Sequence, residues 1–362
     1  MQSLKGGLGR SRKGGSVGRV LGQDVAHAAG GQSTAFIAAD IGGTSARIGL
    51  VRDGLDGVQV LAYQSYPCAG HASLEELLRE FIQTHVSVPV GACVLGCPGR
   101  VDDDGVLLNN YLPWPVSRDA LRSALGIDDL WLINDFEALA YAAKHLDPKN
   151  ARLLTPPRDH VARGAQVVVG PGTGLGSAVL MNGSGLGGVL ATEAGQIALA
   201  PGNPLEAEML AVLAGASSYV SYDRVLSGPG LLNLYGALCT LRGAEPVLET
   251  PESLTATALA DSDPLARQAL EVFCALLGSF TGDLAMLYGA TGGVWLAGGF
   301  LSKIHDFLVR SDFIARFLNK GLMREFLENI PIRLIEHGQL GVVGSATWYV
   351  ERQKGSCRSS AH

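Results

Sequence analysis

The feature that most constrains how this chain can fold is a glycine turn between two short apolar strands, a unit that occurs twice. The first copy covers residues 35–39, 40–44 and 45–52, and the second covers residues 166–169, 170–176 and 177–181. In each copy an apolar run enters the turn and a β-like run leaves it. A unit that recurs in one chain indicates an internal duplication, and therefore two related α/β domains with a cleft between them.

The rest of the sequence alternates helix and strand signals. Ser73 followed by Glu76 is a capping box and predicts a helix from residue 74, and Asp263 before Pro264 predicts another helix start. Further strands are predicted at 91–96, 130–133, 292–297 and 331–335, and a last helix at 341–349. We expect a small α/β domain at 35–146, completed by a C-terminal helix at about 341–352, and a large α/β domain at 147–340.

Composition narrows the class of partner. The chain has 362 residues and a formal net charge of -6, with no basic cluster in its body, which argues against nucleic acid. We find no continuous apolar run of the ~18 residues that a membrane span needs. The scattered cysteines indicate reduced thiols in a soluble, cytoplasmic protein, and Cys93 and Cys97 lack further partners at zinc spacing.

The first 34 residues differ from the body of the chain. They combine glycine pairs with basic residues and carry few large apolar side chains. We expect a disordered tail or a mis-assigned translation start, with a weak basic tether to an acidic surface as the alternative.

Both glycine turns are suited to binding phosphate. Glycine allows close backbone approach and positive φ angles, which let several N–H groups face an anion. The second turn is not followed by a helix, as a dinucleotide-binding fingerprint requires, and neither turn contains the Gly-Lys-Ser/Thr of a P-loop. Ordinary hairpin turns are the alternative, but the duplication and a third glycine pair, Gly298 and Gly299, favour nucleotide binding.

Acidic and amide side chains lie where a cleft is expected. Asp40 beside the first turn either contacts a magnesium-bound water or closes the turn through backbone N–H groups. Asp135 follows a strand and opens a helix, so it is a candidate base or a helix N-cap. Asn110, Asn134, Glu193 and Asp223 are of the types that read sugar hydroxyls, although Asp223 also fits a solvated loop.

In combination, five motifs resemble those of the bacterial glucokinases within the sugar kinase, actin and heat-shock ATPase superfamily. They are the segments 40–47, 133–136, 172–176, 224–231 and 296–299, in a resemblance that covers about residues 35–348. The zinc motif of the related repressor and kinase group is absent. The resemblance implies two duplicated ribonuclease-H-like domains that close over the sugar.

The resemblance also implies an activity and roles for residues. The activity is ATP-dependent phosphorylation of glucose at its 6-hydroxyl, giving glucose 6-phosphate and ADP, with Asp135 as the base. The implied sugar ligands are Asn110, Asn134, Glu193, Gln196 and Asp223. The implied ATP and phosphate contacts are Asp40, Ile41, Gly42, Gly43, Thr44, Gly172, Thr173, Gly174, Gly298 and Gly299. Magnesium would be carried by ATP, with a water-mediated contact to Asp40, and the enzyme would be a homodimer.

Two positions depart from the family pattern. Gln196 stands where the family usually has His, and Asp223 stands where it usually has Glu. Sites that read hydroxyls through paired polar groups discriminate strongly, so N-acetylglucosamine or another hexose is an alternative substrate. An inactive sugar-sensing regulator is the alternative of another class, although residues 1–34 are too short and too rich in glycine to predict a helix-turn-helix.

Overall fold

The structure is a computed structural model that describes residues 34–55, 57–109, 111–156, 164–182, 188–336 and 338–359. The expected tail lies outside these residues apart from Thr34, and so does Asn110. Everything below concerns the described part of the chain.

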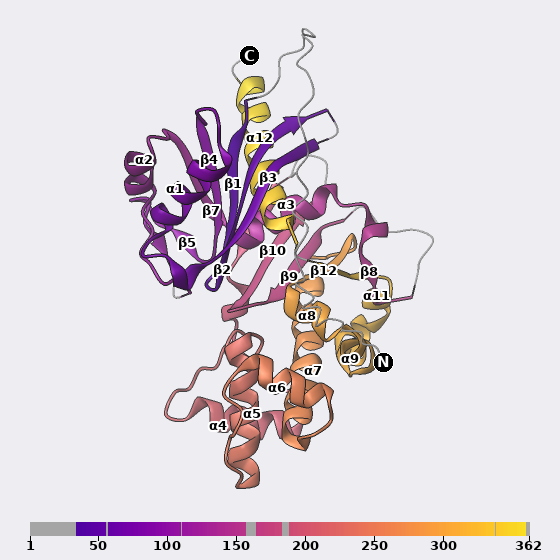
Figure 1. Ribbon diagram of the computed structural model, residues 1–362. Coiled ribbons are helices and arrows are strands. Elements are labelled where there is room, and N and C mark those ends of the chain that lie inside the picture. Colours follow the sequence, from indigo (N-terminus) through magenta and orange to yellow (C-terminus); the bar gives the residue numbers. More distant parts are fainter. Residues whose placement is uncertain are drawn as a thin grey trace, which may run out of the picture. The chain divides into compact units, whose positions relative to one another are not determined.

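The first sheet contains five strands and carries the first glycine turn (Figure 1). In spatial order they are β3 (Gly57–Pro67), β2 (Ser45–Gly54), β1 (Phe36–Ile41), β4 (Ala92–Cys97) and β7 (Asp129–Asn134). β1 is antiparallel to β2 and parallel to β4, and β4 is parallel to β7. Every residue of β1 and β4 is buried, which is why continuous apolar runs form the sheet centre, whereas β3 alternates and forms an edge.

The second sheet repeats this arrangement. In spatial order its strands are β11 (Gly188–Thr192), β10 (Leu175–Met181), β9 (Gln166–Pro171), β12 (Gly293–Ala297), β13 (Ile332–Ile335) and β8 (Arg152–Leu153). β9 is antiparallel to β10 and parallel to β12, as β1 is to β2 and β4. The duplication and the α/β fold class predicted from the sequence are therefore confirmed, with β8 as an added edge strand. The domain boundaries at residues 146 and 340 stay a prediction.

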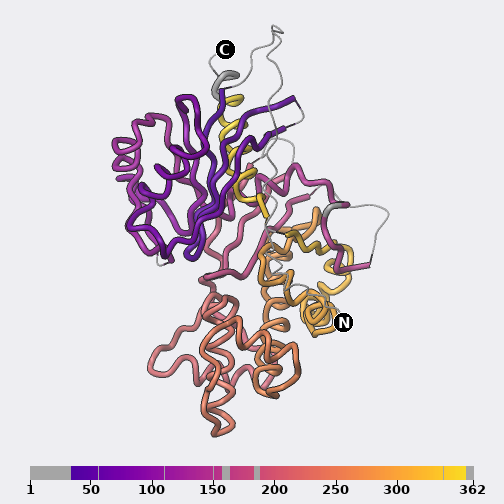
Figure 2. The backbone as a smooth tube through the Cα atoms, viewed as in Figure 1, coloured from indigo at the N-terminus to yellow at the C-terminus, as the bar shows by residue number. Residues whose placement is uncertain are grey.

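Helices from opposite ends of the chain pack on the first sheet. They are α1 (Leu74–His85), α2 (Arg118–Leu125) and α12 (Leu340–Ser359), while α3 (Asp135–His145) contacts strands of both sheets. The Ser73 side chain accepts from the Glu76 amide, which confirms the predicted start of α1. Figure 2 shows the C-terminal helix running beside strands from the start of the chain, and α12 contacts both β1 and α3. α12 is longer than the predicted helix at 341–349.

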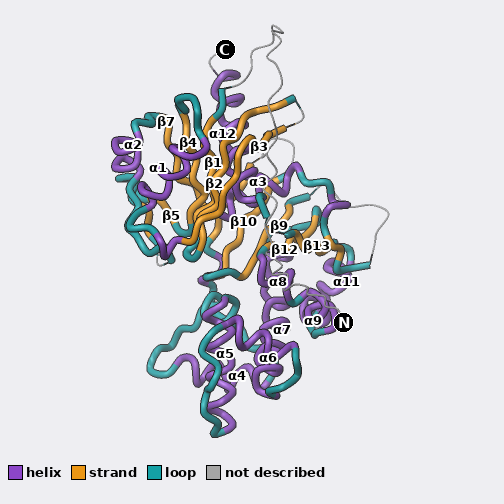
Figure 3. Tube along the Cα trace, viewed as in Figure 1, coloured by secondary structure: helices purple, strands orange, loops and turns teal. Residues whose placement is uncertain are grey.

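A helical region follows β11 (Figure 3). It consists of α4 (Pro204–Ala214), α5 (Gly228–Arg242), α6 (Pro251–Leu259) and α7 (Pro264–Leu287), and the short helices α8 (Gly299–Lys303), α9 (His305–Arg310), α10 (Phe313–Leu318) and α11 (Arg324–Glu328) follow later. Asp263 caps α7 as predicted, through the amides of Leu265 and Ala266. Short 3-10 turns occupy Cys68–Gly70, Pro148–Asn150, Ala194–Gln196 and Gly321–Met323.

α7 is the one described helix that is long and apolar enough to cross a membrane. No such segment was expected from the sequence, because charged and polar residues interrupt its apolar runs. In the structure, 78% of its most apolar window is buried. Its side chains form the centre of the large core that joins the helical region to the second sheet, so α7 is placed as a core helix.

Candidate active site

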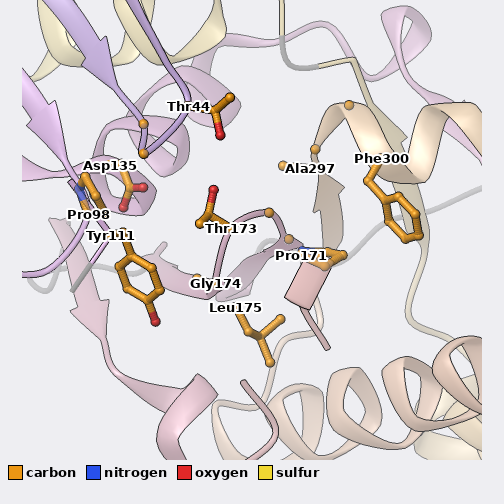
Figure 4. Close-up of a pocket in the computed structure, with 18 of the residues that line it drawn as sticks. Thr44, Pro98, Tyr111, Asp135, Pro171, Thr173, Gly174, Leu175, Ala297 and Phe300 are labelled. Atoms are coloured by element: carbon orange, nitrogen blue, oxygen red, sulfur yellow. The ribbon is translucent and has the colours of Figure 1, made fainter. Parts of the chain in front are cut away.

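The two glycine turns open onto one cavity of about 820 Å³. Nine predicted phosphate or nucleotide contacts line it: Asp40, Gly42, Gly43, Thr44, Gly172, Thr173, Gly174, Gly298 and Gly299. Ile41 does not line it: this last residue of β1 is fully buried in the core of the first sheet. Thr44 and Thr173, one from each turn, point toward each other across the cavity (Figure 4). The duplicated units therefore place their turns face to face.

Close packing, and not positive φ, explains four glycines of the two turns, Gly43, Gly170, Gly174 and Gly176. None of the glycines at positions 42, 43, 170, 172, 174 and 176 has a positive φ, which corrects the expectation from sequence. A Cβ at Gly176 would lie 2.0 Å from the Phe136 ring, and a Cβ at Gly170 would lie 2.1 Å from the Ala297 carbonyl oxygen. Gly298, at the end of β12, does have a φ of +127°. A side chain at these positions would push apart elements that meet at the cavity.

Each turn uses one of its own amides to close itself. The Gly42 N–H donates to the Ser45 carbonyl at 3.0 Å, and the Gly172 N–H donates to the Gly174 carbonyl at 2.7 Å. The donors best placed to bind phosphate are therefore the amides that follow, at Gly43, Thr44, Thr173 and Gly174.

Asp40 forms an ion pair across the first hairpin. Asp40 and Arg47 are cross-strand neighbours of β1 and β2, and their side chains approach to 2.9 Å. Asp40 as a whole is 5% exposed, and it lines the cavity. Gly341, at the start of α12, lies so close that a Cβ there would be 2.5 Å from the Asp40 carboxyl carbon. The ion pair was not among the roles expected for Asp40.

The junction of β7 and α3 presents Asp135 to the cavity. The N-cap of α3 is Asn134, not Asp135: the Asn134 Oδ1 accepts from the amides of Phe136 (2.9 Å) and Glu137 (3.1 Å). The N-cap alternative for Asp135 is therefore wrong. The Asn134 amide group also donates to the Gly99 carbonyl at 3.2 Å, so one of its N–H groups is left for a ligand.

The electrostatics of Asp135 suit a base. Burial and, after it, the charge of Asp40 together raise the pKa of Asp135 to about 7, although the hydrogen bond that its carboxylate accepts from the Phe136 amide acts in the opposite direction. A group with a pKa near neutrality can take a proton and hold it. The charge of Asp40 therefore contributes to the raised pKa of Asp135.

Only some of the predicted sugar ligands line the cavity. Glu193 and Gln196 line it together with Asn134, and burial, followed by the charge of Asp223, raises the pKa of Glu193. Asp223 itself does not line the cavity. Its carboxylate accepts from the Leu175 amide at 2.6 Å and from the Tyr111 hydroxyl at 3.2 Å. Asn110 lies outside the described residues.

Several cavity residues were missed from the sequence. At the end near Gly299 they come from α6 and α8 and are Pro251, Glu252, Thr255, Ala256, Leu259, Phe300 and Lys303. These residues form no local motif, and only the tertiary structure brings α6 and α8 to the same cavity. Tyr111 and Phe136 were also missed, although both adjoin residues that the sequence singled out.

The donor groups fit a magnesium ion that arrives with a nucleotide. Within the described part of the chain, no group of three or more His, Cys, Asp or Glu side chains could hold a metal by itself. Mg²⁺ keeps several waters and is commonly bound by one or two carboxylates together with phosphates. Asp40, beside the first turn, provides such a carboxylate.

Known proteins resemble this chain over most of its length. A family model described as glucokinase matches residues 37–352. A glucokinase-like protein of Xylella fastidiosa (strain Temecula1) is 43% identical over 321 residues, which are 88% of this chain and 95% of that protein. A glucokinase of Saccharophagus degradans is 37% identical over 325 residues, 86% of this chain and 97% of that protein.

Solved structures of glucokinases are also similar to this chain. The crystal structure of a glucokinase from an Antarctic psychrotroph is similar with a TM-score of 0.74 and 31% identity, covering 87% of this chain and 98% of that one. A glucokinase from Streptomyces griseus, solved in complex with glucose and AMPPNP, shares the fold, with a TM-score of 0.58 and 20% identity over 86% of this chain and 98% of that one. The motifs, the duplicated sheets and these similarities lead to one conclusion: the chain belongs to the glucokinase family and is a phosphotransferase of that family, a sugar kinase.

Proposed function

We propose that this sugar kinase transfers the γ-phosphoryl group of ATP to the 6-hydroxyl of glucose. The observation that carries the proposal is the position of Asp135, with a pKa of about 7, in the same cavity as two opposed glycine turns. A base for a hydroxyl group and amides for phosphate are the two parts that phosphoryl transfer requires.

In this proposal each group of cavity residues has its own role in phosphoryl transfer. Asp135 accepts the proton of the sugar hydroxyl, while Asn134, Glu193 and Gln196 orient the sugar ring through directional hydrogen bonds. The amides that follow Gly42 and Gly172 stabilise the charge that develops on the transferred group. Magnesium would enter with ATP and neutralise phosphate charge, with Asp40 close to it. Asn110 and Asp223 stay predicted sugar ligands by family resemblance, as do a homodimer and a cytoplasmic location.

Another hexose is the second candidate. Gln196 lines the cavity, and its backbone carbonyl accepts a hydrogen bond from the Tyr219 hydroxyl, which holds this segment in place. A glutamine can donate and accept, but unlike histidine it has no ring and never becomes cationic. The group at this position therefore tunes which sugar substituents are tolerated.

A coupled ADP-release assay with glucose, N-acetylglucosamine, mannose and fructose tests the proposal. We expect ADP release to require sugar and kcat/KM to be highest for glucose. Higher kcat/KM for N-acetylglucosamine would favour the second candidate. Failure on all four sugars while ATP still binds would contradict kinase activity on these hexoses and support a sensor.

The variant Gln196→His tests the specificity argument in the same assay. If Gln196 tunes the sugar, the ratio of kcat/KM for glucose to that for N-acetylglucosamine should change. An unchanged ratio would show that Gln196 does not read the sugar.

A further inference from the structure

Tyr111 touches both glycine turns. It follows β6 (Leu107–Leu108), which pairs with β5 (Arg100–Val101) in a small two-stranded sheet. A Cβ on Gly43 would lie 2.6 Å from the Tyr111 carbonyl oxygen, and a Cβ on Gly174 would lie 2.7 Å from its ring and hydroxyl. The backbone of Tyr111 therefore lies against the first turn, and its ring lies against the second (Figure 4).

The Tyr111 hydroxyl is tied to the segment that leaves the second turn. It donates to both oxygens of the Asp223 carboxylate, at 3.2 and 3.3 Å. The same carboxylate accepts from the Leu175 amide at 2.6 Å, one residue after Gly174. Burial and the charge of Asp223 raise the pKa of Tyr111 to about 12, so the hydroxyl keeps its proton and donates across the working pH range.

Both ends of this bridge are themselves fixed. The Asn109 side-chain carbonyl accepts from the amides of Tyr111 (3.0 Å) and Leu112 (2.7 Å), which holds the loop that carries the tyrosine. At the other end, the Asp223 amide donates to the Gly195 carbonyl at 2.8 Å. Because both segments are held by further hydrogen bonds, the bond between Tyr111 and Asp223 fixes the position of one segment relative to the other. A bond to a mobile side chain would not do so.

We propose that Tyr111 is a positioning residue for phosphoryl transfer, which sets the second glycine turn against the first through its ring and through Asp223. The inference rests on the proposed function in that it concerns the same phosphate turns. It also gives Asp223 a definite task, as the acceptor that joins Tyr111 to the Leu175 amide.

The variant Tyr111→Phe removes the hydroxyl and keeps the ring. A hydrogen bond to a charged acceptor is worth enough that we expect Kd for ATP to rise about tenfold. AMP lacks the β- and γ-phosphates, so its Kd should stay within about twofold of the wild-type value. The reason is that the substitution displaces only the second glycine turn, which is the proposed phosphate contact. Isothermal titration calorimetry without sugar measures both. A merely structural loss would weaken ATP and AMP alike.

Tyr235→Phe is the matched control, because the Tyr235 hydroxyl donates to Asp263 at 3.1 Å and Tyr235 does not line the cavity. It should leave both Kd values unchanged. Asp223→Asn should also weaken ATP, and the double variant Tyr111→Phe/Asp223→Asn should be no weaker than the worse single variant, because the two act through one contact.

The outcomes are distinguishable. Equal ATP affinity in the wild type and Tyr111→Phe would overturn the inference and leave the kinase proposal standing. Additive effects of the two substitutions would also overturn it, since Tyr111 and Asp223 would then act separately. A wild-type chain that binds no ATP would remove the kinase proposal and the inference together.

Discussion

At the residue scale, the proposed mechanism makes activity depend on the pKa of Asp135. Burial and the charge of Asp40 favour the protonated form, so the carboxylate becomes the main species only above a pH of about 7. A base works when it is deprotonated. We therefore expect kcat/KM for the sugar to fall about tenfold for each pH unit below 7 and to level off above it.

The contribution of the Asp40 charge to the pKa of Asp135 can be tested by substitution. Asp40→Asn removes a neighbouring charge that raises the pKa of Asp135, so the midpoint of the pH profile should move to lower pH. Asp306→Asn is the control, because Asp306 is exposed beside His305 and does not line the cavity. A midpoint that Asp40→Asn leaves in place would contradict the coupling of the two carboxylates.

Single residues were predictable from sequence where a motif fixed them. Asp135 and the residues of both glycine turns were found because their positions follow directly from strand ends and turns. The N-cap of α3 was not predicted correctly, because Asn and Asp have nearly equal preference for the N-cap position. Only the folded geometry shows that Asn134, and not Asp135, is the cap. The reason for the glycines was also missed, since close contacts with Phe136 or Ala297 depend on tertiary packing.

At the element scale, the contact between β10 and α3 sets the position of the base. A Cβ added to Gly176 in β10 would lie only 2.0 Å from the ring of Phe136 in α3. Gly176→Ala should therefore displace the first turn of α3 and Asp135 with it. We expect a loss of about 1–3 kcal/mol in the free energy of unfolding, as for other overpacked sites, and a lower kcat. Urea unfolding and the ADP-release assay measure the two effects.

Gly236→Ala is the matched control at this scale. Gly236 lies within α5, and a Cβ there would have no atom within 4 Å. Alanine is favoured over glycine in a helix, so this variant should gain about 0.5–1 kcal/mol and keep its kcat. If Gly176→Ala behaves like Gly236→Ala, the packing of Phe136 does not position α3.

Elements were predicted best where their burial is simplest. The central strands of both sheets are continuous apolar runs and were located to within one or two residues. The strand β3 and the helices α4, α5 and α6 were not predicted, because β3 is a half-exposed edge strand and the helices have apolar residues on more than one face. The end of the cavity near Gly299, which α6 helps to line, was missed with them.

At the scale of the whole molecule, the cavity is lined by residues from both sheets. Thr44 lies in the turn between β1 and β2 of the first sheet, Thr173 lies in the turn between β9 and β10 of the second, and Asp135 opens the helix after β7. Two ligands that share such a cavity should affect one another. We expect glucose to tighten the binding of a non-hydrolysable ATP analogue, and the analogue to tighten glucose binding by the same factor.

Calorimetric titration of each ligand, with and without the other, measures this coupling. A factor of about 5 or more is typical of coupled sites. Independent binding, with a factor of one in both directions, would mean that the two sheets do not respond to each other when ligands bind.

The most direct test of the account is the turnover of Asp135→Asn, measured beside its sugar binding. The substitution keeps the shape of the side chain and removes the base. We predict that kcat falls by a factor of about 100 or more, the usual contribution of a general base, while Kd for the sugar changes only a few-fold. Turnover close to that of the wild type would contradict the central claim that Asp135 takes the proton in phosphoryl transfer.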